Sequence, residues 1–148
     1  YCDVASGVQR SEERGETFWR RYPGPGLYGT KMLLEQTRPG LDALAAESPL
    51  IFGTAVAGGH LGPGLARYGV VGKSPLSGGI FESRGEGPLA RALKGTGWAA
   101  VVLTGQAQRP VYGLFTGGEL AWLDAEELWG IDTVETTRRL RARHGAAA

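Results

Sequence analysis

The stretch 67–105 constrains the fold more than any other part of this sequence, because strand, turn and helix signals alternate along it. Val70 and Val71 are typical of the end of a strand. The sequence Lys73-Ser74-Pro75 predicts that the strand stops there, since proline has no N–H to give to a ladder. Residues 77–79 are small enough to form the turn that follows. The chain is therefore expected to reverse direction at this point.

Residues 83–87 read Ser-Arg-Gly-Glu-Gly and are predicted to form a glycine-rich loop that opens a helix. Pro88 suits the first turn of that helix, and Leu89, Ala92 and Leu93 recur at helical spacing. A helix N-terminus has free backbone N–H groups, which favour anions by about 0.3–1 kcal/mol per charge at exposed sites. A phosphate-bearing ligand is therefore the first functional hypothesis.

The rest of the chain predicts short elements of both kinds in a single domain over residues 1–148. With 25 glycines spread through the chain without a period, many tight turns between short strands are expected. We therefore predict an α+β fold of mostly antiparallel or mixed sheets with a few short helices, and a flexible tail over 144–148. The further elements are a hairpin over 1–10, helices near 16–20, 28–35 and 133–143, a strand over 49–54 and a hairpin over 111–123.

Two segments of the sequence resemble each other. Gly24-x-Gly26 precedes a predicted helix and the apolar strand 50–54, and Gly85-x-Gly87 precedes a predicted helix and the apolar strand 101–105. An internal duplication is the economical explanation. The alternative is that two such glycine pairs arose independently in a glycine-rich chain.

Charge and cysteine usage exclude several classes of function. The 16 basic and 15 acidic residues nearly balance, so bulk charge favours neither nucleic acid nor an anionic membrane. The single cysteine, Cys2, forms no internal disulfide, and the two distant histidines complete no zinc ligand set. No apolar run approaches the length of a membrane span. We expect a cytoplasmic protein with no metal ligands and no catalytic residue of its own.

Motifs along nearly the whole chain resemble the N-terminal region of the tungsten-dependent aldehyde ferredoxin oxidoreductase family. The most specific is Arg67, followed after five residues by Lys73-Ser74-Pro75-Leu76-Ser77-Gly78. The others, in family order, include Asp3-x-x-Ser6-Gly7, Gly24-x-Gly26-Leu27, Pro49-Leu50-Ile51-Phe52, Arg109-Pro110-Val111-Tyr112 and Leu128-Trp129-Gly130-x-Asp132-Thr133-x-Glu135.

The resemblance implies a specific cofactor and fold. Family members hold tungsten between two pterin cofactors beside a cysteine-bound [4Fe-4S] cluster, oxidise aldehydes to acids and pass electrons to ferredoxin. Their N-terminal domain is an α+β base on which the bis-pterin lies. By this match Arg67 lies between pterin and cluster, and residues 83–87 approach the pterin. The expected cofactor-binding residues are Arg67, Lys73, Ser74, Ser83, Arg84, Gly85 and Gly87.

Departures from the family pattern limit what the chain can do alone. Gly24-Pro25-Gly26-Leu27 replaces the usual Gly-Arg-Gly-Leu, and Glu86 puts a carboxylate where an anionic cofactor would come close. One cysteine cannot supply a four-cysteine cluster site, so the chain has no [4Fe-4S] ligand set. We therefore expect a subunit or homo-oligomer that is not catalytically competent alone and meets ferredoxin only within a complete enzyme. The cofactor itself could have been lost.

Two other classes of function stay open. One is a stand-alone module that binds a pterin or another phosphate ligand without chemistry, with Arg67, Lys73 and Arg84 as its anion contacts. The other is a protein-interaction module in which these cations are solvated or ion-paired. For the family subunit described above, an apolar sheet face that other domains normally cover would be left bare, so self-association is predicted.

Overall fold

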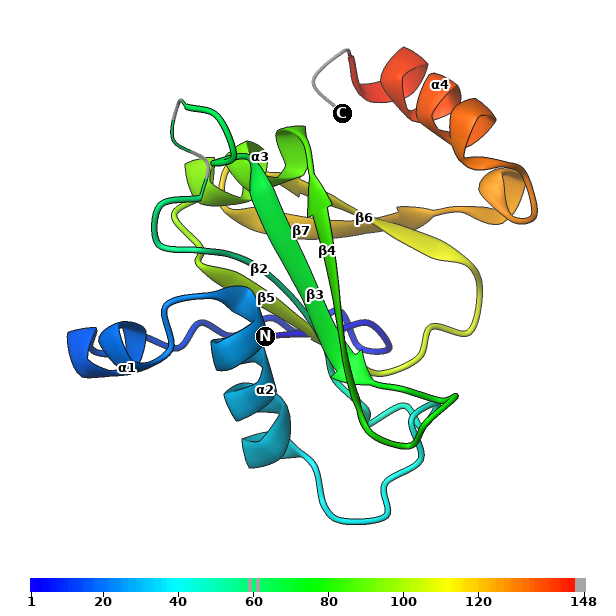
Figure 1. Ribbon diagram of the computed structural model, residues 1–148. Helices are drawn as coiled ribbons and strands as arrows, with labels where there is room; N and C mark the ends of the chain where they lie inside the picture. The colour runs from blue at the N-terminus through cyan, green and yellow to red at the C-terminus, as the bar shows by residue number, and fades with distance from the viewer. Residues whose placement is uncertain (59, 61, 146–148) are drawn as a thin grey trace.

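The computed structural model describes residues 1–58, 60 and 62–145. Short strands and helices alternate along the chain, with a strand hairpin and a helix at its C-terminal end (Figure 1). The elements are β1 (Cys2–Asp3), α1 (Glu16–Arg21), α2 (Pro25–Gln36), β2 (Leu50–Thr54), β3 (Arg67–Lys73), β4 (Ile80–Glu86), α3 (Pro88–Gly95), β5 (Ala100–Thr104), β6 (Val111–Thr116), β7 (Glu119–Asp124), η1 (Glu126–Leu128) and α4 (Thr133–His144).

Five of the strands form one mixed sheet in the order β1-β5-β2-β3-β4. Only the short β1 runs parallel to its neighbour, β5, and the other pairs are antiparallel. β6 and β7 form a separate two-stranded sheet, which lies behind the larger one in Figure 1. The predicted α+β class with mixed sheets is confirmed.

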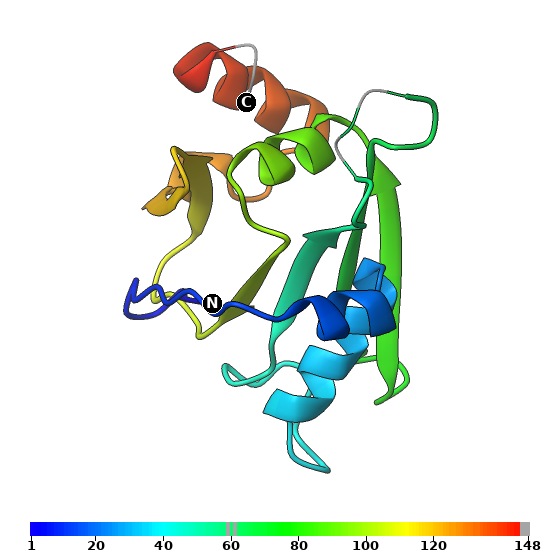
Figure 2. The ribbon, with the colours of Figure 1, turned by 90° about the vertical axis from the view of Figure 1, so that its left-hand side faces the viewer.

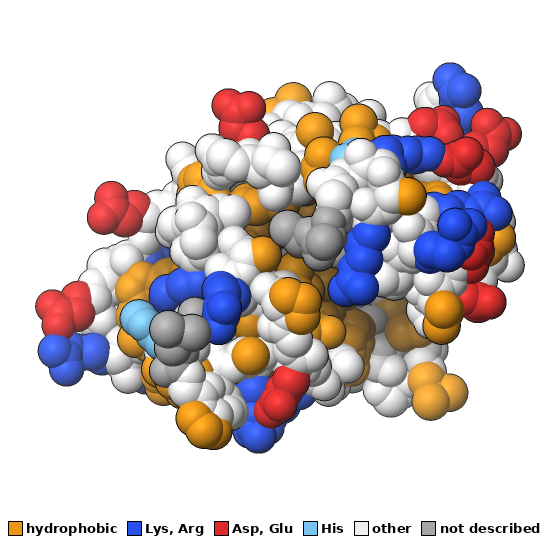
Figure 3. Space-filling view, turned by 90° about the horizontal axis from the view of Figure 1, so that it is seen from above, with side chains coloured by type: hydrophobic (Ala, Val, Ile, Leu, Met, Phe, Trp, Pro, Cys, Tyr) orange, Lys and Arg blue, Asp and Glu red, His pale blue; other side chains and the backbone are white. Residues whose placement is uncertain are grey.

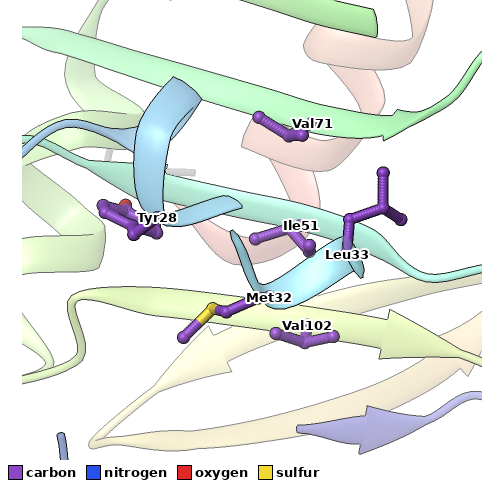
Figure 4. Close-up of a cluster of buried hydrophobic side chains, with 6 residues drawn as sticks. All are labelled: Tyr28, Met32, Leu33, Ile51, Val71 and Val102. Atoms are coloured by element: carbon purple, nitrogen blue, oxygen red, sulfur yellow. The ribbon is translucent and has the colours of Figure 1, made fainter. Parts of the chain in front are cut away.

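The core lies between α2 and one face of the larger sheet (Figure 4). Tyr28, Met32 and Leu33 recur at helical spacing and form the buried side of α2. They face Ile51 of β2, Val71 of β3 and Val102 of β5, which the strand pairing places in one row across the sheet. Every second residue of these strands therefore points toward α2.

Glycines let α2 approach the sheet closely. A Cβ on Gly29 would lie 2.8 Å from a methyl carbon of Val71, and a Cβ on Gly53 would lie 1.7 Å from the Tyr28 hydroxyl oxygen. That hydroxyl lies 3.0 Å from the carbonyl oxygen of Thr54 and 3.1 Å from that of Ala99. Burial raises the pKa of Tyr28, so the hydroxyl keeps its proton and remains a donor.

One predicted secondary-structure element, the loop over 83–87, is wrong. Residues 83–86 belong to β4 and not to a loop, because the whole of β4 pairs with β3, from Arg67 opposite Glu86 to Lys73 opposite Ile80. Of the predicted loop only Gly87 lies outside the strand. In addition, α2 begins at Pro25, earlier than the predicted helix, and the first strand is limited to two residues. The proposed duplication stays a prediction, although both Gly24-Pro25 and Gly87-Pro88 do start helices.

The predicted C-terminal hairpin and last helix are confirmed. Asp132 caps α4, since its carboxylate accepts a hydrogen bond of 2.8 Å from the Glu135 N–H. Arg138 and Arg139 hydrogen-bond to the Glu135 carboxyl and lower its pKa to about 2. His144 is the last residue of α4, and its ring lies 2.8 Å from the Tyr112 hydroxyl. Residues 146–148 of the predicted tail lie outside the described residues.

Two adjacent leucines of α2 test this packing. Leu33 is 2% exposed, whereas Leu34 is 62% exposed. Truncating Leu33 to alanine should lower the free energy of unfolding by about 2–5 kcal/mol, because it leaves a cavity under the helix. Leu34→Ala, the matched control, should change it by less than about 0.5 kcal/mol. Urea unfolding followed by circular dichroism measures both, and equal losses would contradict the packing.

Candidate cofactor-binding corner

The predicted site residues gather mainly around the end of β4 and the start of α3. We call this region the β4–α3 corner. It consists of residues 85–88 together with Ala66 and Arg67, which lie beside them at the start of β3. The Gly87 N–H donates a hydrogen bond of 2.9 Å to the carbonyl oxygen of Ala66. This bond continues the β3–β4 ladder by one step and fixes where α3 begins. Figure 1 shows the start of β3, the end of β4 and α3 at one end of the molecule.

Arg67 is the cation of this corner. Its Nε lies 2.5 Å from Oε1 of Glu86, the residue directly opposite on β4. The two side chains are 68% and 57% exposed, so solvent screens the pair and its contribution to stability is small. An anion arriving from solvent can therefore compete with Glu86 for the guanidinium.

Arg84 lies on the same face of the sheet but is held by a different partner. Its guanidinium donates two hydrogen bonds to Glu82, of 2.7 and 2.9 Å. These bonds lower the pKa of the Glu82 carboxyl. The carboxylate lies against the first turn of α2, where a Cβ on Gly26 would come within 2.5 Å of it. Glu82 was not among the predicted site residues, and it occupies the place where Arg84 could otherwise receive a ligand.

The other predicted residues lie apart from the corner. Lys73 is at the far end of β3, about 20 Å from Arg67 at the usual rise per residue, and its ammonium group donates to the carbonyl oxygen of Leu41. Ser74 accepts a hydrogen bond of 3.2 Å from the Ser77 N–H within the turn. Ser83 pairs with Val70, on the face of the sheet opposite α2. The structure thus brings together Arg67, Gly85 and Gly87, with Arg84 nearby.

The donor set at the corner fits an anionic group in three respects. Arg67 is accessible, no side chain caps the start of α3, and no acidic residue lies in its first turn. Gly87 has φ +150°, and no atom lies within 4 Å of where its Cβ would be. The backbone at Gly87 is therefore open to a ligand. Glu86 is the opposing feature. Seen from this end, other basic side chains are also exposed, several of them with acidic neighbours (Figure 3).

A separate cavity of about 690 Å³ opens beside α2 and the start of β5. Trp19, Tyr28 and Trp98 contribute aromatic walls, and Lys94 lines it too. None of the predicted site residues lines this cavity. Sequence reasoning did not find it, because its walls come from segments that only the fold brings together.

The fold has a counterpart among solved structures. The active-site complex BamBC of benzoyl coenzyme A reductase, solved with 1,5-dienoyl-CoA, contains a chain that superposes with a TM-score of 0.88. The match covers 96% of this chain and 22% of that chain, at 22% sequence identity. At this identity the similarity shows a shared fold and nothing about function.

Sequence comparison identifies the family. The family model described as the N-terminal domain of aldehyde ferredoxin oxidoreductase matches residues 1–148, and the chain belongs to this family. The tungsten-containing aldehyde ferredoxin oxidoreductase of Pyrococcus horikoshii is 32% identical over 143 residues, which is 97% of this chain and 24% of the relative. An aliphatic sulfonate oxidoreductase, WOR-like subunit, of Pyrococcus furiosus is 31% identical over 136 residues, covering 90% of this chain and 21% of that protein.

The chain thus spans about a quarter of the length of the curated relatives it matches. Within residues 1–58, 60 and 62–145, no group of three or more His, Cys, Asp or Glu side chains is arranged to hold a metal ion. No helix in this part of the chain is both long and apolar enough to cross a bilayer.

Substitution of Gly87 tests the geometry of the corner. Its φ of +150° and ψ of −171° lie in a region that almost only glycine adopts, so Gly87→Ala should destabilise the fold by about 1–3 kcal/mol. Gly95, at the end of the same helix, has open space around it and no positive φ. Gly95→Ala should therefore be neutral or stabilising by up to about 1 kcal/mol. Thermal unfolding compares them, and a neutral Gly87→Ala would rule out this backbone conformation.

Proposed function

We propose that this chain is the cofactor-supporting N-terminal part of a tungsten-bispterin oxidoreductase of the aldehyde ferredoxin oxidoreductase type. The observation that carries the proposal is the accessible Arg67 at the β4–α3 corner, in a chain that matches a tungsten-containing aldehyde ferredoxin oxidoreductase over 97% of its length. The corner offers the donors that an anionic pterin cofactor needs.

Each residue of the corner has a role in this proposal. The Arg67 guanidinium donates paired hydrogen bonds to a phosphate or a pterin oxygen, for which its planar fork is suited. Gly87 leaves room for a ligand to approach the backbone, whereas the Tyr68 ring covers Gly85. The uncapped start of α3 adds N–H donors with a favourable dipole. When bound, the tungsten-bispterin supplies the redox chemistry by which an aldehyde is oxidised to an acid.

Glu86 sets the main cost of binding in this proposal. A carboxylate and a phosphate about 4 Å apart repel each other by about 4 kcal/mol at an effective dielectric of 20. The Glu86 side chain is 57% exposed, so it can turn into solvent once Arg67 has bound the ligand. The exposed ion pair between Glu86 and Arg67 contributes only about 0–1 kcal/mol to stability. The new pair between Arg67 and the anion offsets the loss of that contribution.

This chain's own residues do not supply the ligands of the iron–sulfur cluster. A [4Fe-4S] cluster needs four thiolates, and this sequence has one cysteine, which is buried. We therefore propose that the chain acts with a partner part or a further copy, that electrons leave to ferredoxin only from the complete assembly, and that the chain alone does not turn over aldehyde.

Cofactor content tests the proposal without an activity assay. The 148-residue chain is produced in a host that makes the tungsten-bispterin cofactor and is supplied with tungstate, and tungsten and pterin per chain are measured. We expect both to copurify with the wild-type chain and to fall at least about tenfold in Arg67→Ala, because a charge-assisted contact is lost. Arg91→Ala, an exposed arginine on α3, is the control and should keep the wild-type content.

Two results would count against this function. Absence of pterin from folded wild-type protein, or equal pterin in Arg67→Ala, would remove the cofactor role. If the wild-type chain binds inorganic phosphate through Arg67 but never pterin, the alternative of a stand-alone phosphate-binding module replaces it. Circular dichroism of each variant shows whether a loss of cofactor is simply a loss of folding.

A further inference from the structure

β4 is a seven-residue strand at the edge of the sheet (Figure 2). Its inner side pairs with β3 along its whole length, and within the described residues no strand pairs with its outer side. An edge strand of this length presents a row of backbone N–H and C=O groups that another strand can use. The opposite edge is different, because β1 has only two residues.

The register shows which backbone groups face outward. The Ser74 N–H bonds to the Gly79 carbonyl and the Gly87 N–H bonds to the Ala66 carbonyl, and both pairs continue the β3–β4 register. In an antiparallel ladder the hydrogen-bonded pairs alternate with pairs that do not bond each other. Phe81, Ser83 and Gly85 therefore bond to β3. The N–H and C=O groups of Glu82, Arg84 and Glu86 point away from the sheet.

We propose that this edge pairs with β4 of a second copy of the chain, antiparallel and with the twofold axis at Ser83. Glu82 then lies opposite Arg84 of the second copy, and Arg84 lies opposite Glu82 of the second copy. Both are outward-facing positions, so the same two pairs also exchange backbone hydrogen bonds. Two five-stranded sheets become one continuous sheet. The proposal does not use Arg67 and stands apart from the cofactor role.

Charge selects this register over its neighbours. A shift that centres the pairing on Arg84 puts the two arginines opposite each other and Glu82 opposite Glu86, and a shift that centres it on Glu82 puts two glutamates opposite each other. A shift by a single residue places residues whose backbone groups point away from the sheet opposite residues of the second copy whose backbone groups already bond to β3. Like charges directly opposite on adjacent strands destabilise a sheet, whereas opposite charges stabilise it. Charged edges usually prevent pairing, but here the order Glu82-Ser83-Arg84 complements itself.

The two side chains are available for this exchange. Arg84 is 74% exposed and Glu82 is 28% exposed, and they pair with each other along the same strand. Replacing the two local pairs, one in each copy, with two pairs across the interface keeps every charge neutralised. The change costs little because the existing pair is exposed to solvent.

Charge reversal tests the proposal by sedimentation equilibrium. The wild-type chain, of 15.7 kDa, should approach twice that mass as its concentration rises. Arg84→Glu places like charges opposite each other and should weaken dimerisation at least about tenfold, whereas the double exchange Glu82→Arg with Arg84→Glu should restore it to within about threefold. Arg91→Glu makes the same change of net charge on α3 and should leave dimerisation unchanged.

A cysteine at the axis tests the register directly. In the proposed pairing the two copies of residue 83 form a non-hydrogen-bonded pair with Cα atoms about 4.5 Å apart, within the range of a disulfide. Ser83→Cys should therefore give a covalent dimer on mild oxidation, and Ser77→Cys, in the exposed turn after β3, should not. A monomeric wild-type chain, a double exchange that fails to restore association while folded, or equal crosslinking of the two cysteine variants would each overturn the proposal.

Discussion

The seating of α2 on the sheet is the contact on which the rest of the structure depends. Gly29 and Gly53 let the helix approach until Tyr28 reaches across β2 to the carbonyl oxygens of Thr54 and Ala99. Those two carbonyls belong to the end of β2 and to the residue before β5, so one hydroxyl holds two antiparallel strands to the helix. β3 then packs its Val71 against the same helix, and its pairing with β4 follows from its position.

The β4–α3 corner owes its geometry to that pairing. Because Arg67 starts β3 and Glu86 ends β4, the register makes them opposite partners and places the start of α3 beside both. The corner therefore combines a cation, an uncapped helix start and a carboxylate. In the proposed cofactor role, an anionic ligand competes with Glu86 for Arg67. Both side chains are exposed, so solvent screens the ion pair that the ligand would replace.

Much of this could be predicted from sequence, and the errors have physical causes. The stop at Lys73-Ser74-Pro75, the hairpin β6–β7 and the Asp132 cap were local signals and were confirmed. The strand β4 was missed because glycines at 85 and 87 outweighed the alternation of Glu82, Arg84 and Glu86, which has the period of a strand. No sequence rule could place Lys73 against the Leu41 carbonyl, since that contact joins residues distant along the chain.

Hydrogen exchange at single amides tests the central claim, which is that residues 83–86 are a strand held to β3 and that they carry the corner at their end. The account predicts slow exchange for the N–H groups of Ser83 and Gly85, which bond to β3, and for that of Gly87, which bonds to Ala66. Exchange of all three at the rates of an unstructured chain would show a free loop and would contradict the account.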